Sequence, residues 1–191
     1  MKSLFSLIFS LTIALLLISC GGSKSGLSDV SEGDIPDWYL NPPTDNEHFY
    51  APKSATSQDM QLAIDKAATD GRVAIQQQVE AKVTGLQKKF DEETGVGKDA
   101  QLLQMFTSAS KVVVSGSLSG SRIAKQKIGK DNGIFRAYVL IEYPVGAAQA
   151  ALVDQIKKNE QMYTRFRASQ TFDELEKEAE KYDEFKKNQQ K

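Results

Sequence analysis

Apolar residues recur every three or four positions across residues 60–90, and this spacing constrains the fold more than any other feature of the chain. A repeat of about 3.6 residues places apolar side chains on one face of an α-helix. We therefore predict one long amphipathic helix, with Ser57 as its N-cap and Asp59 near its positive end. The small residues that would let the middle of this helix lie close to a sheet are Ala67, Ala68, Gly71 and Ala74.

The end of this helix is predicted at residues 92–98, where Gly95 and Gly97 make a helical interior costly. This segment lacks the preceding strand and the glycine-lysine spacing of a phosphate-binding loop, so we expect a helix C-cap and a turn. Asp99 can then cap a short second helix. The apolar residues expected on its buried side are Leu102, Leu103, Phe106 and Ala109.

A long β-hairpin is predicted over residues 111–143. The β-branched residues at 112–114 favour a strand, and the alternating small residues at 115–121 suit a strand that bends at glycine. A change in the phase of the apolar residues indicates a β-bulge near Gly120. Asp131-Asn132-Gly133 supplies the turn, because these residue types accept positive φ angles.

The return strand of this hairpin has two faces of different character. The face that carries Tyr138 and Leu140 is half apolar, and we expect another chain to cover it. A further strand at residues 48–52 would lie at a sheet edge, because Pro52 has no backbone N–H. These elements predict an α+β fold, with a three-stranded antiparallel sheet (β-α-β-β-α order) packed on the long helix. The residues expected to meet that helix are Phe135, Ala137, Val139, Ile141 and Tyr143.

Residues 35–43 combine the chain's only tryptophan with three prolines, which argue against a regular helix or a central strand. We expect an extended lid or turn here. Trp38 is predicted to pack over one end of the core, with the prolines fixing its approach. A ligand contact made by Trp38 is the alternative.

The chain is predicted to be helical after Pro144, with an apolar stripe that ends near Phe166. Thr171 and Glu174 fit a capping box, so a new helix should begin with Thr171 as its N-cap. This C-terminal helix either packs on its own domain or meets a partner subunit. Its candidate binding and assembly residues are Phe172, Leu175, Tyr182 and Phe185.

The N-terminal sequence predicts export and lipidation. Lys2 followed by the apolar residues 4–18 is typical of a secretory signal, and this run is shorter than the roughly 20 residues that a membrane span needs. Leu17-Ile18-Ser19-Cys20 matches the bacterial lipobox, whose processing attaches a diacylglycerol to the thiol and acylates the new N-terminus. Gly21, in place of an aspartate, favours the outer membrane. An uncleaved anchor helix and an ordinary cleaved signal are the alternatives.

Four segments follow from these patterns. We predict a lipoprotein signal peptide at 1–19, a flexible tether at 20–34, an α+β lipoprotein domain at 35–150 and a C-terminal helical extension at 151–191. The tether is rich in Gly, Ser, Lys and Asp and has scarcely any apolar anchor, so it cannot offset the entropy of ordering.

Composition argues against several classes of function. The net charge is −1, with 24 basic and 25 acidic residues, so no nucleic-acid footprint is expected. Cys20 is the only cysteine and His48 the only histidine, so we expect no intramolecular disulfide, no CxxC site and no His-rich metal site. We predict no cofactor and no enzymatic activity. The paired acids Glu92-Glu93 are expected to be solvated, and a hydrolase that uses carboxylates alone is the remaining catalytic alternative.

Several short motifs follow Cys20 in a fixed order. They are Pro36-Asp37-Trp38 with Asn41-Pro42, Phe49-Tyr50-Ala51, the alanine-rich residues 63–74, and Tyr138-Val139-Leu140-Ile141 before Pro144. This order resembles the Lpp-twenty family of small bacterial outer-membrane lipoproteins, which includes relatives in flagellar basal discs. The resemblance covers residues 35–150. It implies an α+β domain without enzymatic activity that assembles at the outer membrane.

The sequence thus predicts a lipid-anchored envelope protein with a structural or assembly role, held at the outer membrane by acyl chains on Cys20. We expect it to form homo-oligomers or an envelope protein complex. The alternative is a binding module that holds a peptide, a glycan or a small apolar ligand. The residues expected to take part in binding or assembly are Trp38, Tyr138, Leu140, Phe172, Leu175, Tyr182 and Phe185.

Overall fold

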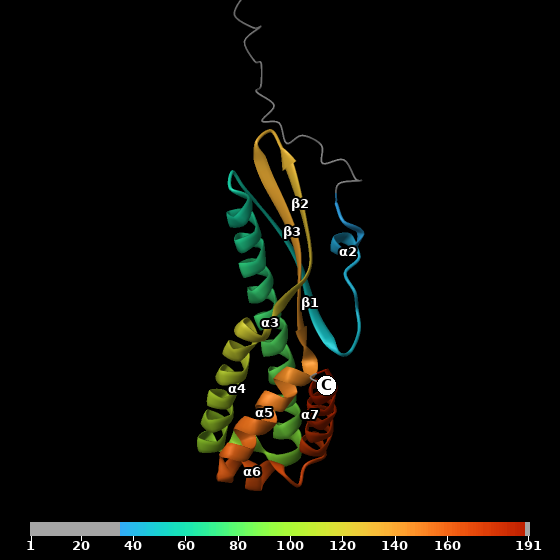
Figure 1. The fold of residues 1–191 in the computed structure, drawn as a ribbon. Helices are drawn as coiled ribbons and strands as arrows, with labels where there is room; N and C mark the ends of the chain where they lie inside the picture. Colours follow the sequence, from blue (N-terminus) through green and yellow to red (C-terminus); the bar gives the residue numbers. More distant parts are fainter. Residues whose placement is uncertain (1–34, 190–191) are drawn as a thin grey trace, which may run out of the picture. The chain divides into compact units, whose positions relative to one another are not determined.

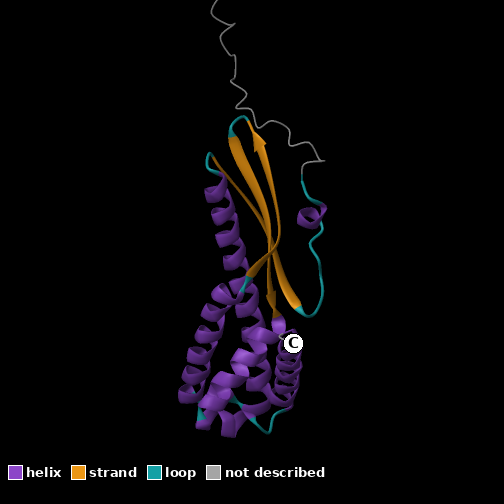
Figure 2. Cartoon of the chain, in the orientation of Figure 1, coloured by secondary structure: helices purple, strands orange, loops and turns teal. Residues whose placement is uncertain are grey.

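The computed structural model describes residues 35–189, which fall within one compact unit, Gly33–Lys191 (Figure 1). The predicted signal peptide, Cys20 and the predicted tether lie outside the described residues. A three-stranded antiparallel sheet and a set of helices make up this unit (Figure 2). The predicted α+β class is therefore confirmed.

The sheet has the strand order β1-β3-β2, with β1 at His48–Ser57, β2 at Arg122–Asp131 and β3 at Ile134–Pro144. Both strand pairs are antiparallel, so β1 and β2 are the two edges. The predicted edge position of Pro52 is confirmed. In the hairpin turn, Asn132 has a φ of 47° and Gly133 a φ of 81°, which is the left-handed region that these residue types favour.

Helix α3, Met60–Thr94, is the predicted long helix and lies against the sheet. Its N-cap is Asp59, whose carboxylate accepts a hydrogen bond from the Leu62 amide at 2.8 Å. The prediction of Ser57 as N-cap is wrong, because its hydroxyl accepts from the Asp59 amide just before the helix begins. The helix ends at Gly95, whose φ of 69° makes it the predicted C-cap.

The face of α3 that meets the sheet is built from small and apolar residues. Ala63 and Ile64 form a buried cluster with Ala137 on β3. Two helical turns further along, Gly71 lies directly against Ile141. The predicted helix-facing side of β3 is therefore the observed one.

Gly71→Ala is expected to destabilise the protein, because a Cβ at this position would overlap the β-branched side chain of Ile141. Overpacking of this kind lowers the free energy of unfolding by about 1–3 kcal/mol, which urea titration measures. Gly85→Ala is the matched control in the same helix, since nothing lies within 4 Å of its Cβ position. The control should raise the free energy of unfolding by about 0.4–1 kcal/mol. Equal stability of the two variants would contradict this packing.

Helix α4, Ala100–Gly120, corrects the prediction of a strand at residues 112–120. Asp99 caps this helix as predicted, by accepting hydrogen bonds from the Gln101 and Leu102 amides. The helix then continues through the β-branched run, because packing against α3 outweighs a local strand preference. The buried residues that recur at helical spacing are Leu102, Phe106, Ala109, Val113 and Ser117.

The predicted element order matches in part. The 3₁₀ turn η2 (Val96–Lys98) and α4 stand between α3 and the hairpin, so β2 begins only at Arg122. The irregularity in the β2–β3 pairing lies between Ile123 and Lys125, and the predicted bulge near Gly120 is wrong. Gly120 instead ends α4.

Three helices follow the sheet, α5 at Val145–Lys158, α6 at Glu160–Phe166 and α7 at Gln170–Gln189. α7 packs on α5 and also contacts α3. The predicted domain boundary between residues 150 and 151 falls inside α5. In the shared core, Phe90 of α3, Phe106 of α4 and Phe166 of α6 pack with ring centroids 4.4, 5.8 and 5.9 Å apart.

Candidate functional site

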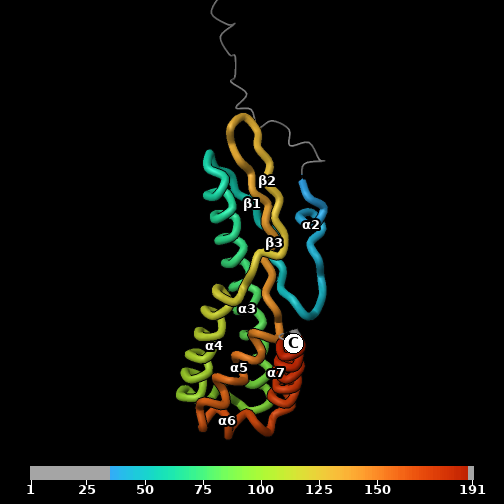
Figure 3. Tube along the Cα trace, in the orientation of Figure 1, coloured from blue at the N-terminus to red at the C-terminus, as the bar shows by residue number. Residues whose placement is uncertain are grey.

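Helix α2, Asp37–Leu40, is a single turn that lies beside β1 and β3 on the side of the sheet away from α3 (Figure 3). Tyr39 makes its main contacts with the sheet. The Tyr39 ring centroid lies 5.0 Å from that of Tyr138, and its hydroxyl lies 3.3 Å from Oγ of Ser54. Trp38 is half-buried beside Tyr39. The expectation of an extended segment is wrong for residues 37–40, which form one turn of α-helix, and Tyr39 rather than Trp38 holds this turn on the sheet.

The prediction that another chain covers Tyr138 and Leu140 is wrong. Tyr138 keeps 5% of its surface exposed and Leu140 keeps 1%, within this chain alone. Tyr39 of the same chain packs on this face of β3, so neither side chain is available to a partner. The half-apolar pattern correctly indicated a buried face of β3. The segment that covers this face is α2 of the same chain, and not another chain.

The four candidate assembly residues of α7 separate into two groups. Phe172 and Leu175 are buried in the core, with 2% and 1% of their surfaces exposed, so they stabilise the fold itself. Tyr182 is half-buried and lies close to Gly146 of α5. Phe185 is 51% exposed. Of the two alternatives for this helix, packing on its own domain is the one observed, and Phe185 remains free for a partner.

Two hydrogen-bonded contacts tie the C-terminal helices to the end of α3. Glu93 accepts hydrogen bonds from the hydroxyl and the amide of Thr171, at 2.6 and 3.1 Å. Arg165 of α6 donates from Nη2 and Nε to the Thr94 carbonyl, at 2.6 and 3.1 Å. The partners are 78 and 71 residues apart in the chain, so no local pattern could have identified them.

The start of α7 also corrects a predicted cap. The hydroxyl of Ser169 accepts a hydrogen bond from the Phe172 amide, which is the N-cap arrangement that was expected for Thr171. Thr171 is free for Glu93 because the helix begins at Gln170, two residues earlier than a Thr171 cap would place its start. A carboxylate from another helix therefore satisfies the first turn of α7.

Glu93→Gln is expected to change the pH dependence of stability. Hydrogen bonds from Thr171 lower the pKa of Glu93 below its ordinary value of 4.5. A lowered pKa in the folded state gives stability that is present above pH 4.5 and is lost as the pH falls through the lowered pKa. The variant cannot titrate here, so it should be less stable than the wild type near neutral pH. The difference should shrink on acidification.

Thermal unfolding between neutral and acidic pH measures this effect. Glu92→Gln is the matched control, because it removes the same charge one residue away from the α7 cap. Its stability should follow the wild-type pH profile. A Glu93→Gln profile identical to that of Glu92→Gln would contradict the role of Glu93 as a cap.

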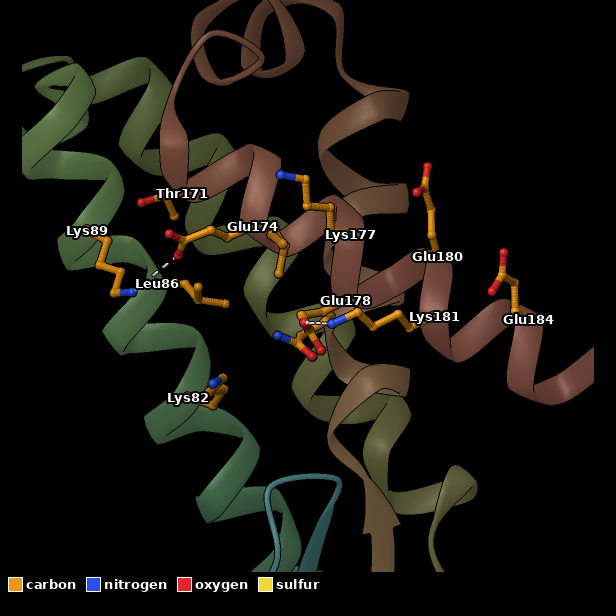
Figure 4. Close-up of a pocket in the computed structure, with 12 residues that line it drawn as sticks. Lys82, Leu86, Lys89, Thr171, Glu174, Lys177, Glu178, Glu180, Lys181 and Glu184 are labelled. Atoms are coloured by element: carbon orange, nitrogen blue, oxygen red, sulfur yellow. Dashed lines mark hydrogen bonds and ion pairs between the residues drawn. The ribbon is translucent and has the colours of Figure 1, made fainter.

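A groove of about 550 Å³ lies between α3 and α7 (Figure 4). Its lining carries charged side chains of both signs and a few apolar ones, including Leu86. Two ion pairs lie in this lining. Nζ of Lys89 is 3.8 Å from Oε2 of Glu174, and Nζ of Lys181 is 2.6 Å from Oε1 of Glu178. Other charged residues of the lining are Lys82, Lys177, Glu180 and Glu184.

Asp45 organises the turn before β1. Its carboxylate accepts hydrogen bonds from the amides of Glu47 and His48 and from the Tyr50 hydroxyl. Burial opposes ionisation, but these bonds outweigh it and lower the pKa of Asp45. Burial and the bond to Asp45 raise the pKa of Tyr50 to about 12. These shifted groups hold the turn, which is a structural task.

Within residues 35–189, no three side chains of His, Cys, Asp or Glu gather in a way that could hold a metal ion. In the same part of the chain, no helix has both the length and the apolar composition to cross a membrane. Cys20, the predicted lipidation site, lies outside this part.

Comparison with known proteins adds no relative. Neither a model of a protein family nor a curated protein matches this chain. The resemblance to the Lpp-twenty family therefore stays a prediction from the order of its motifs.

Proposed function

We propose that this chain is a lipid-anchored bacterial envelope protein with a structural or assembly role, held at the outer membrane. The observation that carries the proposal is Leu17-Ile18-Ser19-Cys20 followed by Gly21, at the end of an apolar signal. One acyl chain binds a membrane only marginally, whereas two or more hold a protein there stably. The modification expected at Cys20 would therefore be enough to fix the whole chain to a bilayer.

The polar groups of the folded unit support a structural role. Asp45 holds a turn, Glu93 caps α7, and Lys157 pairs with Glu176 between α5 and α7. The bond to Glu176 raises the pKa of Lys157, and the other two groups also owe their shifted pKa values to bonds within the fold. Structural ion-pair and hydrogen-bond networks also shift pKa values, so these three shifts agree with a structural role.

Mass spectrometry of the native N-terminus tests the proposal. The expected result is a chain that begins at Cys20 and carries a diacylglycerol and an amide-linked acyl chain. An unmodified Cys20, or a chain that begins downstream of it, would exclude lipid anchoring.

A second candidate function rests on the groove between α3 and α7. Its volume of about 550 Å³ lies in the range of ligand sites, and its mixed lysines and glutamates suit a polar ligand such as a glycan or a peptide. Chemical-shift changes at Lys82 and Leu86 on addition of peptidoglycan fragments would favour this binding function. We rank it second because two ion pairs already engage the groove's own side chains.

A further inference from the structure

Strand β2 is unusually basic for its length. Four of its 10 residues are basic, Arg122, Lys125, Lys127 and Lys130, and only Asp131 is acidic. Charged residues on an edge strand discourage pairing with another chain, which explains the presence of charge. Protection of the edge would not require any of these charges to lie on the same side of the sheet as α2. The strand register nevertheless places several of them on that side.

The strand register places four basic residues on the sheet face opposite α3, and one of them, Arg122, is paired there with Glu142. Lys125 stands directly across from Leu140, and Lys127 directly across from Tyr138. Residues that face each other in adjacent strands project to the same side of a sheet. Arg136 is two residues from Tyr138 along β3, so it projects to that side too. We call Lys125, Lys127 and Arg136 the cationic face.

The segment that enters the fold lies on this same side. Tyr39 of α2 packs on Tyr138, so the described chain begins beside the cationic face. Two exposed apolar side chains accompany it, Leu40 on α2 with 54% of its surface exposed and Ile134 on β3 with 47%. Basic residues next to exposed apolar ones are typical of surfaces that lie on anionic membranes.

One acidic group of this side forms an ion pair. Glu142 is paired with Arg122, whose Nε donates a hydrogen bond to Oε1 of Glu142 at 2.6 Å. Asp37 accepts a hydrogen bond from the Asn41 side chain at 3.0 Å. Asp131 lies in the turn at the end of β2. Lys125, Lys127 and Arg136 form no ion pair with any described residue, so the cationic face keeps its charge for an outside partner.

We infer that the cationic face docks on anionic phospholipid headgroups of the membrane that holds the chain. This inference rests on the proposed lipid anchor at Cys20. Residues 21–34 join Cys20 to the folded unit, and 14 residues span at most about 50 Å. The anchor and the cationic face can therefore meet one bilayer at the same time, with the α3 side of the sheet turned away from it.

The test uses the mature chain with Cys20→Ser, so that no acyl chain contributes to binding. Its partition is measured on vesicles of phosphatidylglycerol mixed with phosphatidylcholine, and on vesicles of phosphatidylcholine alone. Each basic residue close to an anionic bilayer strengthens binding about fivefold. The triple change Lys125→Gln, Lys127→Gln and Arg136→Gln should therefore weaken binding to the anionic vesicles on the order of a hundredfold. High salt should weaken wild-type binding as well.

The matched control removes three exposed lysines from the helices, by Lys88→Gln, Lys111→Gln and Lys158→Gln. It has the same net charge as the triple variant and should bind within about threefold of the parent chain, since these lysines lie away from the sheet face. The double change Lys125→Gln and Lys127→Gln touches only exposed residues and should cost about thirtyfold, which keeps the test valid if the Arg136 change impairs folding.

Two results would overturn the inference. The first is a control variant that loses as much affinity for the anionic vesicles as the triple variant does. The second is binding to pure phosphatidylcholine vesicles that is as strong as binding to the anionic vesicles. Both leave the proposed function intact, because the anchor is tested separately by the mass of the native N-terminus. Conversely, an unmodified Cys20 together with charge-selective vesicle binding would remove the anchor and keep the cationic face.

Discussion

Cys20→Ser is expected to release the protein from the membrane fraction into the soluble fraction. The variant must be exported behind an ordinary cleavable signal, because an uncleaved apolar segment at 4–18 could itself hold the chain in a membrane. Each acyl chain contributes about 0.8 kcal/mol for every buried CH₂ group. Basic residues near an anionic surface contribute about 1 kcal/mol each, which is small beside two or three long acyl chains. Loss of the acyl chains should therefore dominate.

Fractionation of cells by ultracentrifugation measures this release. Ser19→Ala is the matched control, because it keeps a small residue before the cysteine and leaves the thiol in place. It should remain in the membrane fraction, like the wild type. A Cys20→Ser chain that still sediments with membranes at high salt would mean that the folded unit, and not the lipid, holds the protein there.

The elements predicted correctly are those whose signals are local. The stripe across residues 60–90 predicted α3, because burial on one face of a helix repeats with the helical period. Gly95 and Asp99 predicted the turn between α3 and α4, because each residue type has a preferred cap position. Asn132-Gly133 predicted the hairpin turn for the same reason, since positive φ angles are costly for most other residues.

The wrong predictions concern segments whose local signal is ambiguous. Residues 112–120 mix valines with serines and glycines, and such a run suits a twisted strand as well as a slim helix face. Val113 and Ser117 settle the matter, since they are four residues apart and both are buried. Only the presence of α3 at the right distance favours the helix, and that information is not in the segment itself.

The candidate site was predicted least well, because its contacts join distant parts of the chain. Tyr39 reaches Tyr138, and Glu93 reaches Thr171, across long stretches of sequence. The choice of Trp38 over Tyr39 followed residue size, which does not indicate which of two neighbours faces the sheet. A signal for the cationic face was present in the alternation of Lys125 and Lys127, but its meaning depends on which side of the sheet α2 covers.

Phe166→Ala is expected to lower the free energy of unfolding by about 3–5 kcal/mol, because it empties a fully buried aromatic site. For a domain of this size the melting temperature should fall by roughly 10 °C or more. Phe185→Ala is the matched control, and with 51% of its surface exposed it should change stability by no more than about 0.5 kcal/mol.

This pair of variants also decides whether the C-terminal helices form a separate extension. The Phe166 ring stacks on that of Phe90 in α3, with centroids 4.4 Å apart, and lies edge-on to that of Phe106 in α4, with centroids 5.9 Å apart. Removing this ring therefore weakens the core that all these helices share. Calorimetry of Phe166→Ala should therefore show one transition at a lower temperature. Two transitions, with the upper one at the wild-type temperature, would mean that the sheet and α3 fold without the C-terminal helices. The single transition is expected because Glu93 and Thr94, at the end of α3, are bonded to Thr171 and Arg165 across the same junction.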